Sequence, residues 1–347
     1  MHVTKNIAII GAGIAGMDAA IHLSELGHKV TLLEKEHKTG GNLANWDRLF
    51  PSLTPATEIL DPLQHKLSDR NIDLKLRAEI ESIKKERNVF LLRTKNYGEF
   101  SADAVLVTTG FKLFNAEKKE EFGYGIYDNV ITSADLEELF KKHEPVVTAS
   151  DKQPKRIGMI HCVGSRDEKS GNTYCSKVCC ITGVKQAIEL KQELPATEIF
   201  CFYIDLRMYG PKFEELYREA QEKWGVQFIR GRVSEASENM DGSIQIKAED
   251  TLAGRPIKMN LDLMVLLSGM VPSEGTKEIM AITGMERASN NFVKPLDEHM
   301  NKNLTATEGL FVAGACTSPM SATDAISDAR SAVAMIHQYL MNSPVNI

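Results

Sequence analysis

Short apolar runs alternate with helical patterns from the start of the chain onward. Residues 6–10 read Asn-Ile-Ala-Ile-Ile, which predicts a short strand buried in a parallel sheet. Apolar side chains spaced three and four apart over residues 14–26 predict a helix that Gly27 ends. A second strand is predicted over residues 29–33, directly before Glu34. This order of strand, helix and strand predicts a βαβ unit.

The second half of the chain repeats this order. Strands are predicted over residues 156–161 and 198–204, with a helix over residues 178–193 between them. Near the end, an apolar run over residues 310–315 is followed by a helical pattern over residues 322–340. The alternation predicts the α/β class, with two dinucleotide-binding (Rossmann-like) domains.

Composition and charge narrow the class of protein. A length of 347 residues suggests two domains, and 43% hydrophobic with 25% charged residues is typical of a globular protein. The net charge of -6 gives no basic footprint for nucleic acid, and no apolar stretch reaches the length of a membrane span. Because the first predicted strand begins at residue 6, we expect no signal peptide and a cytoplasmic location.

A glycine motif joins the first predicted strand to the first helix. Gly11, Gly13 and Gly16 match the pattern G-x-G-x-x-G. The first glycine of that pattern permits a tight turn, the second lets a pyrophosphate approach the backbone, and the third allows close packing of helix on strand. Glu34 lies 18 positions after Gly16, close to the spacing at which an acid binds the ribose hydroxyls. We predict a dinucleotide site here; the alternative is a purely structural glycine turn.

The cysteines are concentrated in one segment. The chain has six, Cys162, Cys175, Cys179, Cys180, Cys201 and Cys316, of which the first four fall within nineteen residues. Their C-x12-C-x3-C-C spacing replaces the glycine-rich turn expected between the strand at 156–161 and the helix at 178–193. Four thiolates there could surround a cubane iron–sulfur cluster or hold tetrahedral zinc. The remaining alternative is that they are buried, inert packing groups, as we expect for Cys201.

Three further segments resemble the FAD domain of the two-dinucleotide-fold flavoproteins, the thioredoxin-reductase-like group. They are Thr39–Leu43, Ala104–Gly110 and Leu304–Ala315. The resemblance implies a FAD domain made of residues 1–112 and 285–347, split by a second βαβ domain at residues 113–284. The residues that it implies around FAD are Gly11, Gly13, Ile14, Ala15, Gly16, Glu34, Lys35, Gly40, Gly41, Asn42, Leu43, Ile80, Thr109, Gly110, Gly314, Ala315 and Thr323.

The last FAD segment departs from the pattern of that group. Many members carry Gly-Asp where this chain has Gly314-Ala315, so the usual carboxylate near the ribitol chain is missing. Asp324 and Thr323 are the candidates to replace it. The helix that follows would place its N-terminus near the flavin, where its dipole would favour an anionic reduced flavin.

The segment that contains the cysteines resembles a more specific family. His161–Glu168 together with Tyr174–Cys180 resemble the HdrA family of heterodisulfide reductases, as do Tyr203–Arg207, Phe228–Arg232 and Leu267–Pro272. In that family these cysteines bind a [4Fe-4S] cluster, which implies Cys162, Cys175, Cys179 and Cys180 as ligands here. Family members also carry Gly-Ala in the last FAD segment.

The resemblance also implies a function. The chain lacks the added ferredoxin modules of the methanogen proteins and is similar to the short form in the heterodisulfide reductase-like complex of sulfur-oxidising prokaryotes. This implies a homodimeric, flavin-dependent oxidoreductase subunit that passes electrons from thiol or sulfane-sulfur oxidation, with other iron–sulfur subunits and a lipoate-binding carrier protein as partners. Two alternatives remain: an NAD(P)H-dependent disulfide oxidoreductase, which the missing C-x-x-C pair disfavours, and a non-enzymatic redox sensor.

Overall fold

The chain folds into two compact units. In this computed structural model, which describes residues 4–342, unit 1 contains the chain up to Ala44, Thr57–Lys112 and the chain from Val271 onward. Unit 2 contains Asn45–Ala56 and Leu113–Met270. Unit 1 is therefore assembled from three separate stretches of the sequence, whereas two, residues 1–112 and 285–347, were expected.

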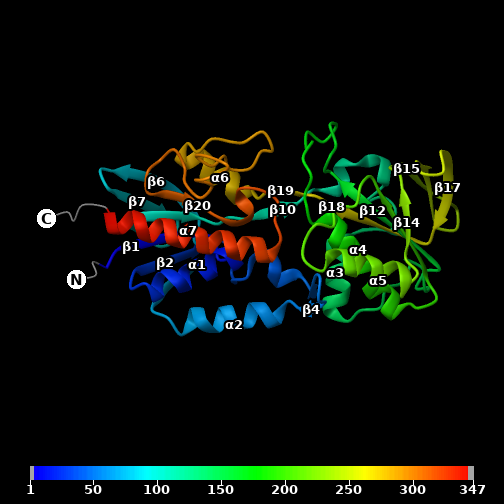
Figure 1. The fold of residues 1–347 in the computed structure, drawn as a ribbon, viewed down its shortest axis with the longest axis horizontal. Coiled ribbons are helices and arrows are strands. Elements are labelled where there is room, and N and C mark those ends of the chain that lie inside the picture. Colours follow the sequence, from blue (N-terminus) through cyan, green and yellow to red (C-terminus); the bar gives the residue numbers. More distant parts are fainter. Residues whose placement is uncertain (1–3, 343–347) are drawn as a thin grey trace. The chain divides into compact units, whose positions relative to one another are not determined.

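A five-stranded parallel sheet forms the centre of unit 1, with the strand order β20-β9-β1-β2-β5. Its strands are β1 (Asn6–Ile10), β2 (Lys29–Glu34), β5 (Ile72–Leu76), β9 (Ala104–Val107) and β20 (Leu310–Val312). The helices α1 (Ile14–Glu25) and α7 (Ala322–Asn342) lie side by side although they come from opposite ends of the sequence (Figure 1). The strands β1, β9 and β20 are apolar apart from Asn6 at the start of β1, because a parallel sheet is buried on both faces.

Unit 1 also contains a smaller antiparallel sheet and two more helices. They are β6 (Ile80–Glu86), β7 (Val89–Thr94), β8 (Gly98–Ala102), α2 (Thr57–Ser68) and α6 (Glu274–Thr283). The helix α6 begins after Ser273, whose Oγ accepts a hydrogen bond from the Thr276 N–H at 3.0 Å. Ile279 and Met280 of α6 pack in the hydrophobic core of unit 1. The resemblance assigned residues 271–284 to the inserted domain, but they lie in unit 1, because the apolar face of α6 is buried there.

Unit 2 repeats the parallel arrangement. Its sheet has the order β11-β18-β12-β13-β14. The strands are β11 (Val130–Thr132), β12 (Arg156–Val163), β13 (Glu198–Tyr203), β14 (Gln227–Arg230) and β18 (Leu263–Ser268), and the helices are α3 (Ser133–Lys142), α4 (Cys179–Glu193) and α5 (Phe213–Glu222). The predicted α/β fold class with two Rossmann-like domains is confirmed.

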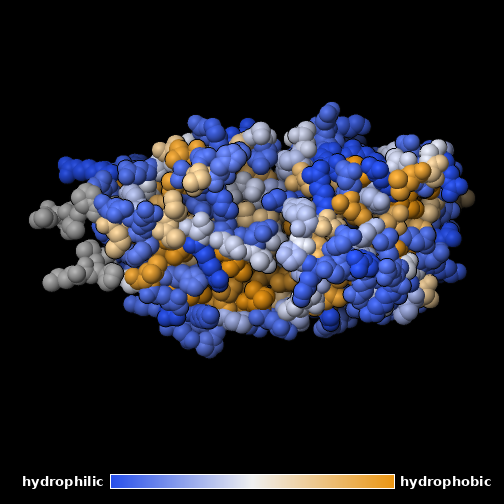
Figure 2. Space-filling view, viewed as in Figure 1, coloured by the Kyte–Doolittle hydropathy of each residue, from blue (hydrophilic) through white to orange (hydrophobic). Residues whose placement is uncertain are grey.

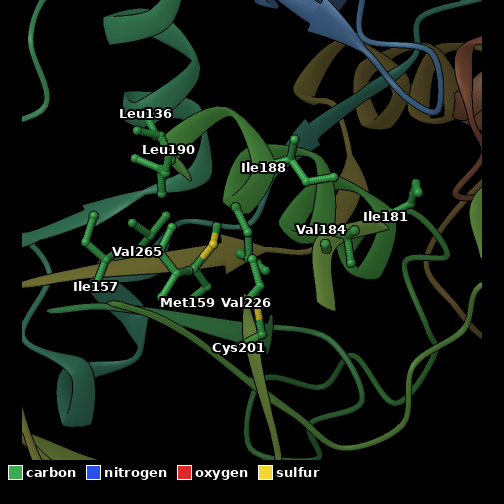
Figure 3. Packing of buried hydrophobic residues seen from close by; sticks show 14 of the residues in the cluster. Leu136, Ile157, Met159, Ile181, Val184, Ile188, Leu190, Cys201, Val226 and Val265 are labelled. Carbon is green, nitrogen blue, oxygen red and sulfur yellow. The ribbon is translucent and has the colours of Figure 1, made fainter. Parts of the chain in front are cut away.

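Shorter elements complete unit 2. An antiparallel sheet is formed by β15 (Val233–Glu238), β16 (Ile244–Asp250) and β17 (Arg255–Leu261), and β3 (Arg48–Leu49) pairs with β4 (Thr54–Pro55). Figure 3 shows the hydrophobic core between the sheet and its helices, with the sulfur of Cys201 among the apolar side chains. Cys201 is fully buried in this core, which confirms its expected packing role.

The remaining elements are short. Two of the crossings between the units lie in β10 (Phe111–Leu113) and β19 (Met270–Pro272), which form a two-stranded sheet. The others lie on either side of the segment Asn45–Ala56. The 3-10 helices are η1 (Gly41–Asn45), η2 (Ala116–Lys118), η3 (Glu120–Phe122) and η4 (Gly314–Cys316). Among the described residues, no helix is long and apolar enough to span a membrane. The face shown in Figure 2 is largely hydrophilic, with smaller hydrophobic areas between the polar residues.

Candidate functional site

The topology of unit 1 marks one end of β1 as a ligand site. From β1 the chain continues to β2 on one side, while β9 pairs with β1 on the other side. In open parallel sheets ligands bind outside the carboxyl ends of the strands at such a switch of direction. The glycine motif, which follows β1 directly, lies at this position.

The three glycines of the motif differ in what surrounds them. A side chain at Gly11 would place its Cβ 2.5 Å from the Thr108 carbonyl oxygen, and one at Gly16 would place it 1.9 Å from the Gly11 carbonyl oxygen. At Gly13 the nearest atom would be the Gly41 Cα, 4.0 Å away. Gly11 and Gly16 are therefore required by packing, whereas the space beside Gly13 is open for a ligand.

A second glycine pair approaches this space. Gly40 forms an isolated parallel bridge with Gly13, and its N–H donates to the Ala12 carbonyl at 2.8 Å. Gly41 lies so close to Gly13 that a Cβ there would be 3.0 Å from the Gly13 Cα. The structure thus brings the predicted residues Gly13, Gly40 and Gly41 together.

Glu34 is buried at the end of β2, and its carboxylate binds the backbone of the glycine turn and the backbone just after β2. One oxygen, Oε2, accepts from the Ala12 N–H at 2.7 Å, and Oε1 accepts from the Glu36 N–H at 2.9 Å. Glu34 is therefore held beside the glycine turn, at the carboxyl end of β2, where an acid can meet ribose hydroxyls.

The Thr-Gly turn after β9 is fixed by hydroxyl contacts within unit 1. The Thr109 and Thr276 hydroxyls are 2.7 Å apart, and Thr276 Oγ1 donates to the Gly110 carbonyl at 3.0 Å. Asn42 donates from Nδ2 to the Phe111 carbonyl at 2.8 Å. The predicted residues Asn42, Thr109 and Gly110 thus hold the backbone of their loops in place.

A buried carboxylate that sequence reasoning missed holds the backbone at Gly314. Asp328 on α7 is buried, and its Oδ2 accepts from the Gly314 N–H at 2.8 Å. Asp324, the replacement suggested from the sequence, is exposed and accepts instead from the Ser321 N–H at 3.2 Å. Asp328 lies four residues, about one helical turn, beyond Asp324. This helical spacing is the feature of the sequence that could have pointed to Asp328.

The other residues expected around FAD differ in how far they are buried. Ala15 lies against Gly314, since a Cβ at Gly314 would be 2.9 Å from the Ala15 Cβ. Leu43 and Ala315 are buried, and Ile14 and Ile80 are half-buried. Lys35 and Thr323 are exposed, and the structure gives neither a contact that marks it as a ligand residue.

The arrangement in unit 1 fits a dinucleotide. A Cβ at position 13 would fill the open side of the glycine turn, and the helix α1 begins after Gly13 without a side-chain cap. Uncapped N–H groups at a helix N-terminus bind phosphate, and the dipole favours its negative charge. The residues that would hold FAD are accordingly the glycine turn for the pyrophosphate and Glu34 for the ribose.

In unit 2 the corresponding position is occupied by cysteine. The strand β12 pairs with β18 on one side and β13 on the other, so its carboxyl end is again a switch point. The register of β12 against β18 shifts between Ile160 and Val163, and Cys162 within this irregularity has a φ of 62°. A bulge of this kind redirects a side chain.

The other three cysteines follow in a loop and at the start of a helix. Cys175 is half-buried, and its Sγ accepts from the Lys177 N–H at 3.3 Å. Cys179 and Cys180 are the first two residues of α4 and are both buried. The Cys180 thiol donates to the carbonyl oxygen of Asp205 at 3.6 Å.

Hydrogen bonds inside unit 2 fix the loop that carries Cys175. The hydroxyls of Ser165 and Ser176 are hydrogen-bonded to each other, and Ser176 Oγ also accepts from the Met270 N–H at 2.8 Å. Lys119 donates to Asp167 at 2.7 Å, and both side chains are buried. Contacts within the chain therefore hold this loop in place.

Burial raises the pKa of three of the four thiols, those of Cys162, Cys179 and Cys180. It raises the pKa of Cys162 to about 11, with the nearby thiols of Cys180 and Cys175 adding to the effect. Burial also raises the pKa of Cys179 well above its usual value, and again the other three thiols contribute. The pKa of Cys180 is raised by burial and is opposed by the Arg207 N–H, which hydrogen-bonds to the sulfur. The four sulfur atoms thus lie within electrostatic reach of one another.

The four cysteine sulfurs lie near one another but do not form a ready-made site for a single metal ion. Within residues 4–342, no group of three or more His, Cys, Asp or Glu side chains has the geometry to hold a metal ion. The donor chemistry nevertheless fits an iron–sulfur cluster, because all four cysteines are free of disulfides. An Arg166 Nη1 that is buried without a hydrogen-bond acceptor also lies in this region. Cys162, Cys175, Cys179 and Cys180 would be the ligands.

Two family models match the chain. Residues 9–61 match the NAD(P)-binding Rossmann-like domain, and residues 178–329 match the pyridine nucleotide-disulphide oxidoreductase family. The first covers the glycine turn and Glu34. The second begins one residue before α4 and extends into α7.

Curated relatives match nearly the whole chain. A CoB–CoM heterodisulfide reductase iron-sulfur subunit of Methanopyrus kandleri, of the HdrA type, is 32% identical over 96% of this chain and 63% of its own length. The corresponding CoB–CoM heterodisulfide reductase iron-sulfur subunit of Methanocaldococcus jannaschii is 31% identical over 97% of this chain and 64% of its own length. The chain thus spans slightly less than two thirds of the length of these relatives.

Solved structures agree on the fold. A thioredoxin reductase from T. acidophilum superposes with a TM-score of 0.67 at 19% identity, covering 97% of this chain and all of that one. At this identity the similarity establishes the fold alone.

Proposed function

Because this chain belongs to the HdrA family of heterodisulfide reductases, we propose that it is an electron-transfer subunit carrying FAD in unit 1 and a [4Fe-4S] cluster in unit 2. It would act in a cytoplasmic heterodisulfide reductase-like complex, where it would pass electrons from a partner that oxidises a thiol or sulfane-sulfur compound to an electron acceptor. When bound, the flavin would supply two-electron chemistry and the cluster one-electron chemistry.

One observation carries the proposal: cysteine stands where a nucleotide domain has its phosphate-binding glycines. The carboxyl end of β12 is the switch point of the second parallel sheet, and Cys162 lies there instead of a glycine turn. Cys179 and Cys180 begin α4, at the helix end that would otherwise face a pyrophosphate. A site of this kind favours a thiolate-held cluster over NAD(P)H.

The residues of the chain have separable tasks in this proposal. The glycine turn at Gly13 would hold the pyrophosphate, and Glu34 would orient the ribose. Asp328 holds the Gly314 backbone, which lies against Ala15 of α1. The cysteines would hold the cluster, and burial would keep water away from it.

The partners are part of the proposal. The names of the methanogen relatives describe multi-subunit enzymes, such as an H(2):CoB-CoM heterodisulfide,ferredoxin reductase. For this shorter chain we propose a homodimer that meets other iron–sulfur subunits and a lipoate-binding carrier protein.

The experiment is a cofactor analysis of anaerobically purified protein. We expect one FAD and about four iron and four sulfide per chain, with a signal from the reduced cluster in electron paramagnetic resonance after dithionite addition. Cys175→Ser is expected to lower the iron content severalfold, whereas the control Cys201→Ala leaves it unchanged because Cys201 lies in the hydrophobic core.

Two other outcomes would overturn the proposal. FAD with zinc in place of iron would make the cysteines a structural zinc site. FAD without metal, reduced rapidly by NADPH, would place the chain among the NAD(P)H-dependent disulfide oxidoreductases.

A further inference from the structure

Arg166 occupies an unusual position beside the cysteines. It follows β12 in the loop toward Cys175 and has a φ of 53°. Its Nη2 donates to the Asp205 carboxylate at 2.6 Å. Its Nη1 is buried and has no hydrogen-bond acceptor among the described residues. A buried N–H without an acceptor is costly, so such groups usually have a partner in the working state of a protein.

Asp205 connects this arginine to the cysteine site. The carbonyl oxygen of Asp205 accepts from the Cys180 thiol at 3.6 Å, while its carboxylate binds Arg166. The same carboxylate lies 3.5 Å from Arg230, and Arg232 donates to the Arg166 carbonyl at 2.7 Å. Asp205 thus holds the Arg166 guanidinium directly, while Arg232 holds the Arg166 backbone and Arg230 holds the Asp205 carboxylate.

The guanidinium is also electrostatically coupled to the thiols. Arg166 lies close enough to Cys162 and Cys175 for its charge to act on both sulfurs. Neutral thiols are poor hydrogen-bond acceptors. Thiolates and bridging sulfides would be strong acceptors for a guanidinium N–H.

We propose that Arg166 donates its Nη1 hydrogen bond to the iron–sulfur cluster held by Cys162, Cys175, Cys179 and Cys180, and thereby raises the midpoint potential of that cluster. The inference rests on the proposed function, since it requires the cluster. One-electron reduction adds one unit of negative charge to the cluster, and a fixed cation beside it stabilises that charge. Asp205 acts as the positioning residue, because it fixes the guanidinium that makes the contact.

The test is a redox titration of purified holoprotein, with dithionite as reductant and the reduced cluster followed by electron paramagnetic resonance. We expect Arg166→Gln to lower the midpoint potential, so that the ratio of reduced to oxidised cluster is about tenfold smaller at the potential that half-reduces the unmodified protein. Arg166→Lys keeps the charge without the planar fork and is expected to show a smaller decrease.

The matched control is Arg156→Gln. Arg156 begins the same strand, β12, and its guanidinium pairs with the exposed Glu198 at 2.8 Å. This variant is expected to keep the potential of the unmodified protein. Iron and sulfide are counted in every variant, and circular dichroism confirms folding.

The outcomes separate the role of Arg166 from the proposed function of the chain. A full iron content with an unchanged potential in Arg166→Gln would overturn the role of Arg166 and leave the proposed function intact. Unmodified protein that binds no iron would overturn both. If Arg166→Gln fails to fold, an Arg166→Lys protein with the unmodified potential would still refute the hydrogen bond, and a lowered potential would support it.

Discussion

At the scale of single residues, substitutions at Gly13 and Gly16 can distinguish an effect on FAD binding from an effect on folding. Gly13 has extended backbone angles, φ -72° and ψ -177°, that alanine also adopts, and the nearest atom to a new Cβ is 4.0 Å away. We expect Gly13→Ala to keep the melting temperature of the flavin-free protein. Its FAD affinity should fall at least about tenfold, because the methyl group fills the space that a pyrophosphate needs.

Gly16→Ala is the matched comparison. Its Cβ would be 1.9 Å from the Gly11 carbonyl oxygen, so α1 would have to move away from β1. We expect a loss of stability of a few kcal/mol even without flavin. The measurements are thermal unfolding of both flavin-free variants and fluorescence titration with FAD. Normal FAD binding by Gly13→Ala would contradict the placement of the pyrophosphate.

The raised pKa values of the cysteine thiols predict how cluster loading depends on pH. Burial raises the pKa of Cys162 to about 11 and also raises those of Cys179 and Cys180, so these three thiols are protonated at neutral pH in the absence of iron. Iron binds thiolates, and loading must release these protons. We therefore expect reconstitution with iron and sulfide to release protons and to weaken as the pH falls from about 8.5 to about 6.5. A pH-independent iron affinity, measured with a competing chelator, would contradict four cysteine ligands.

Residue patterns predicted part of this site and missed the rest. The cysteines and glycines stand out because their spacing is local, within one turn or loop. Asp328 and Arg166 do not, because their roles depend on partners 14 and 39 residues away, Gly314 and Asp205. Acids and arginines are common on surfaces, so only the folded chain distinguishes these two from solvated neighbours.

At the scale of elements, α4 contains a buried charge cluster as well as two cysteines. Lys185 is 1% exposed and pairs with Glu137 of α3 and, at 2.8 Å, with Glu189. Glu137 also accepts from the Asp47 N–H at 3.0 Å, and so ties the segment Asn45–Ala56 to unit 2. Breaking one partner of such a buried pair usually costs about 3–5 kcal/mol.

Glu189 makes the stability of the protein depend on pH. Burial raises its pKa from 4.5 to about 8, and Glu137 adds to the increase while Lys185 opposes it. Because the folded state holds the proton more tightly than the unfolded state, the contribution to stability is present below about pH 4.5. It is lost as the pH rises through about 8.

We expect Glu189→Gln, which mimics the protonated side chain, to flatten the decrease in unfolding free energy between about pH 5 and about pH 8 by up to about 1 kcal/mol per pH unit. The measurement is urea unfolding at several pH values. Glu198→Gln, which removes an exposed carboxylate, serves as the control. A slope in Glu189→Gln equal to that of the unmodified protein would show that Glu189 is already ionised in the folded state.

Helices and strands were predictable from the sequence where the element is buried in the core of its unit. The strand β1 has the bounds read from the sequence, and α4 begins one residue after its predicted start, because apolar runs and helical spacing are strong signals. The expected domain boundaries place Asn45–Ala56 in the first domain and α6 in the second, whereas the structure has Asn45–Ala56 in unit 2 and α6 in unit 1. Each joins its unit through contacts with residues far away in the sequence, such as the Asp47–Glu137 hydrogen bond, and no local pattern encodes such contacts.

At the scale of the whole molecule, each candidate cofactor site is built from a single compact unit. The glycine turn, Glu34 and Asp328 all belong to unit 1, and the four cysteines with Arg166 and Asp205 belong to unit 2. Each unit has its own parallel sheet and its own hydrophobic core. The residues that would bind one cofactor therefore depend on packing that the other cofactor's residues do not share.

This separation predicts that the two cofactors load independently. Gly13→Ala should lose FAD and keep about four iron per chain, while Cys175→Ser should lose iron and keep one FAD. The measurement is flavin and iron analysis of both variants after identical anaerobic purification, with Cys201→Ala as the control for a cysteine in the core. Loss of both cofactors in either variant, with normal circular dichroism, would contradict independence. It would mean that binding at one site orders the other, so that one cofactor is required for the protein to accept the second.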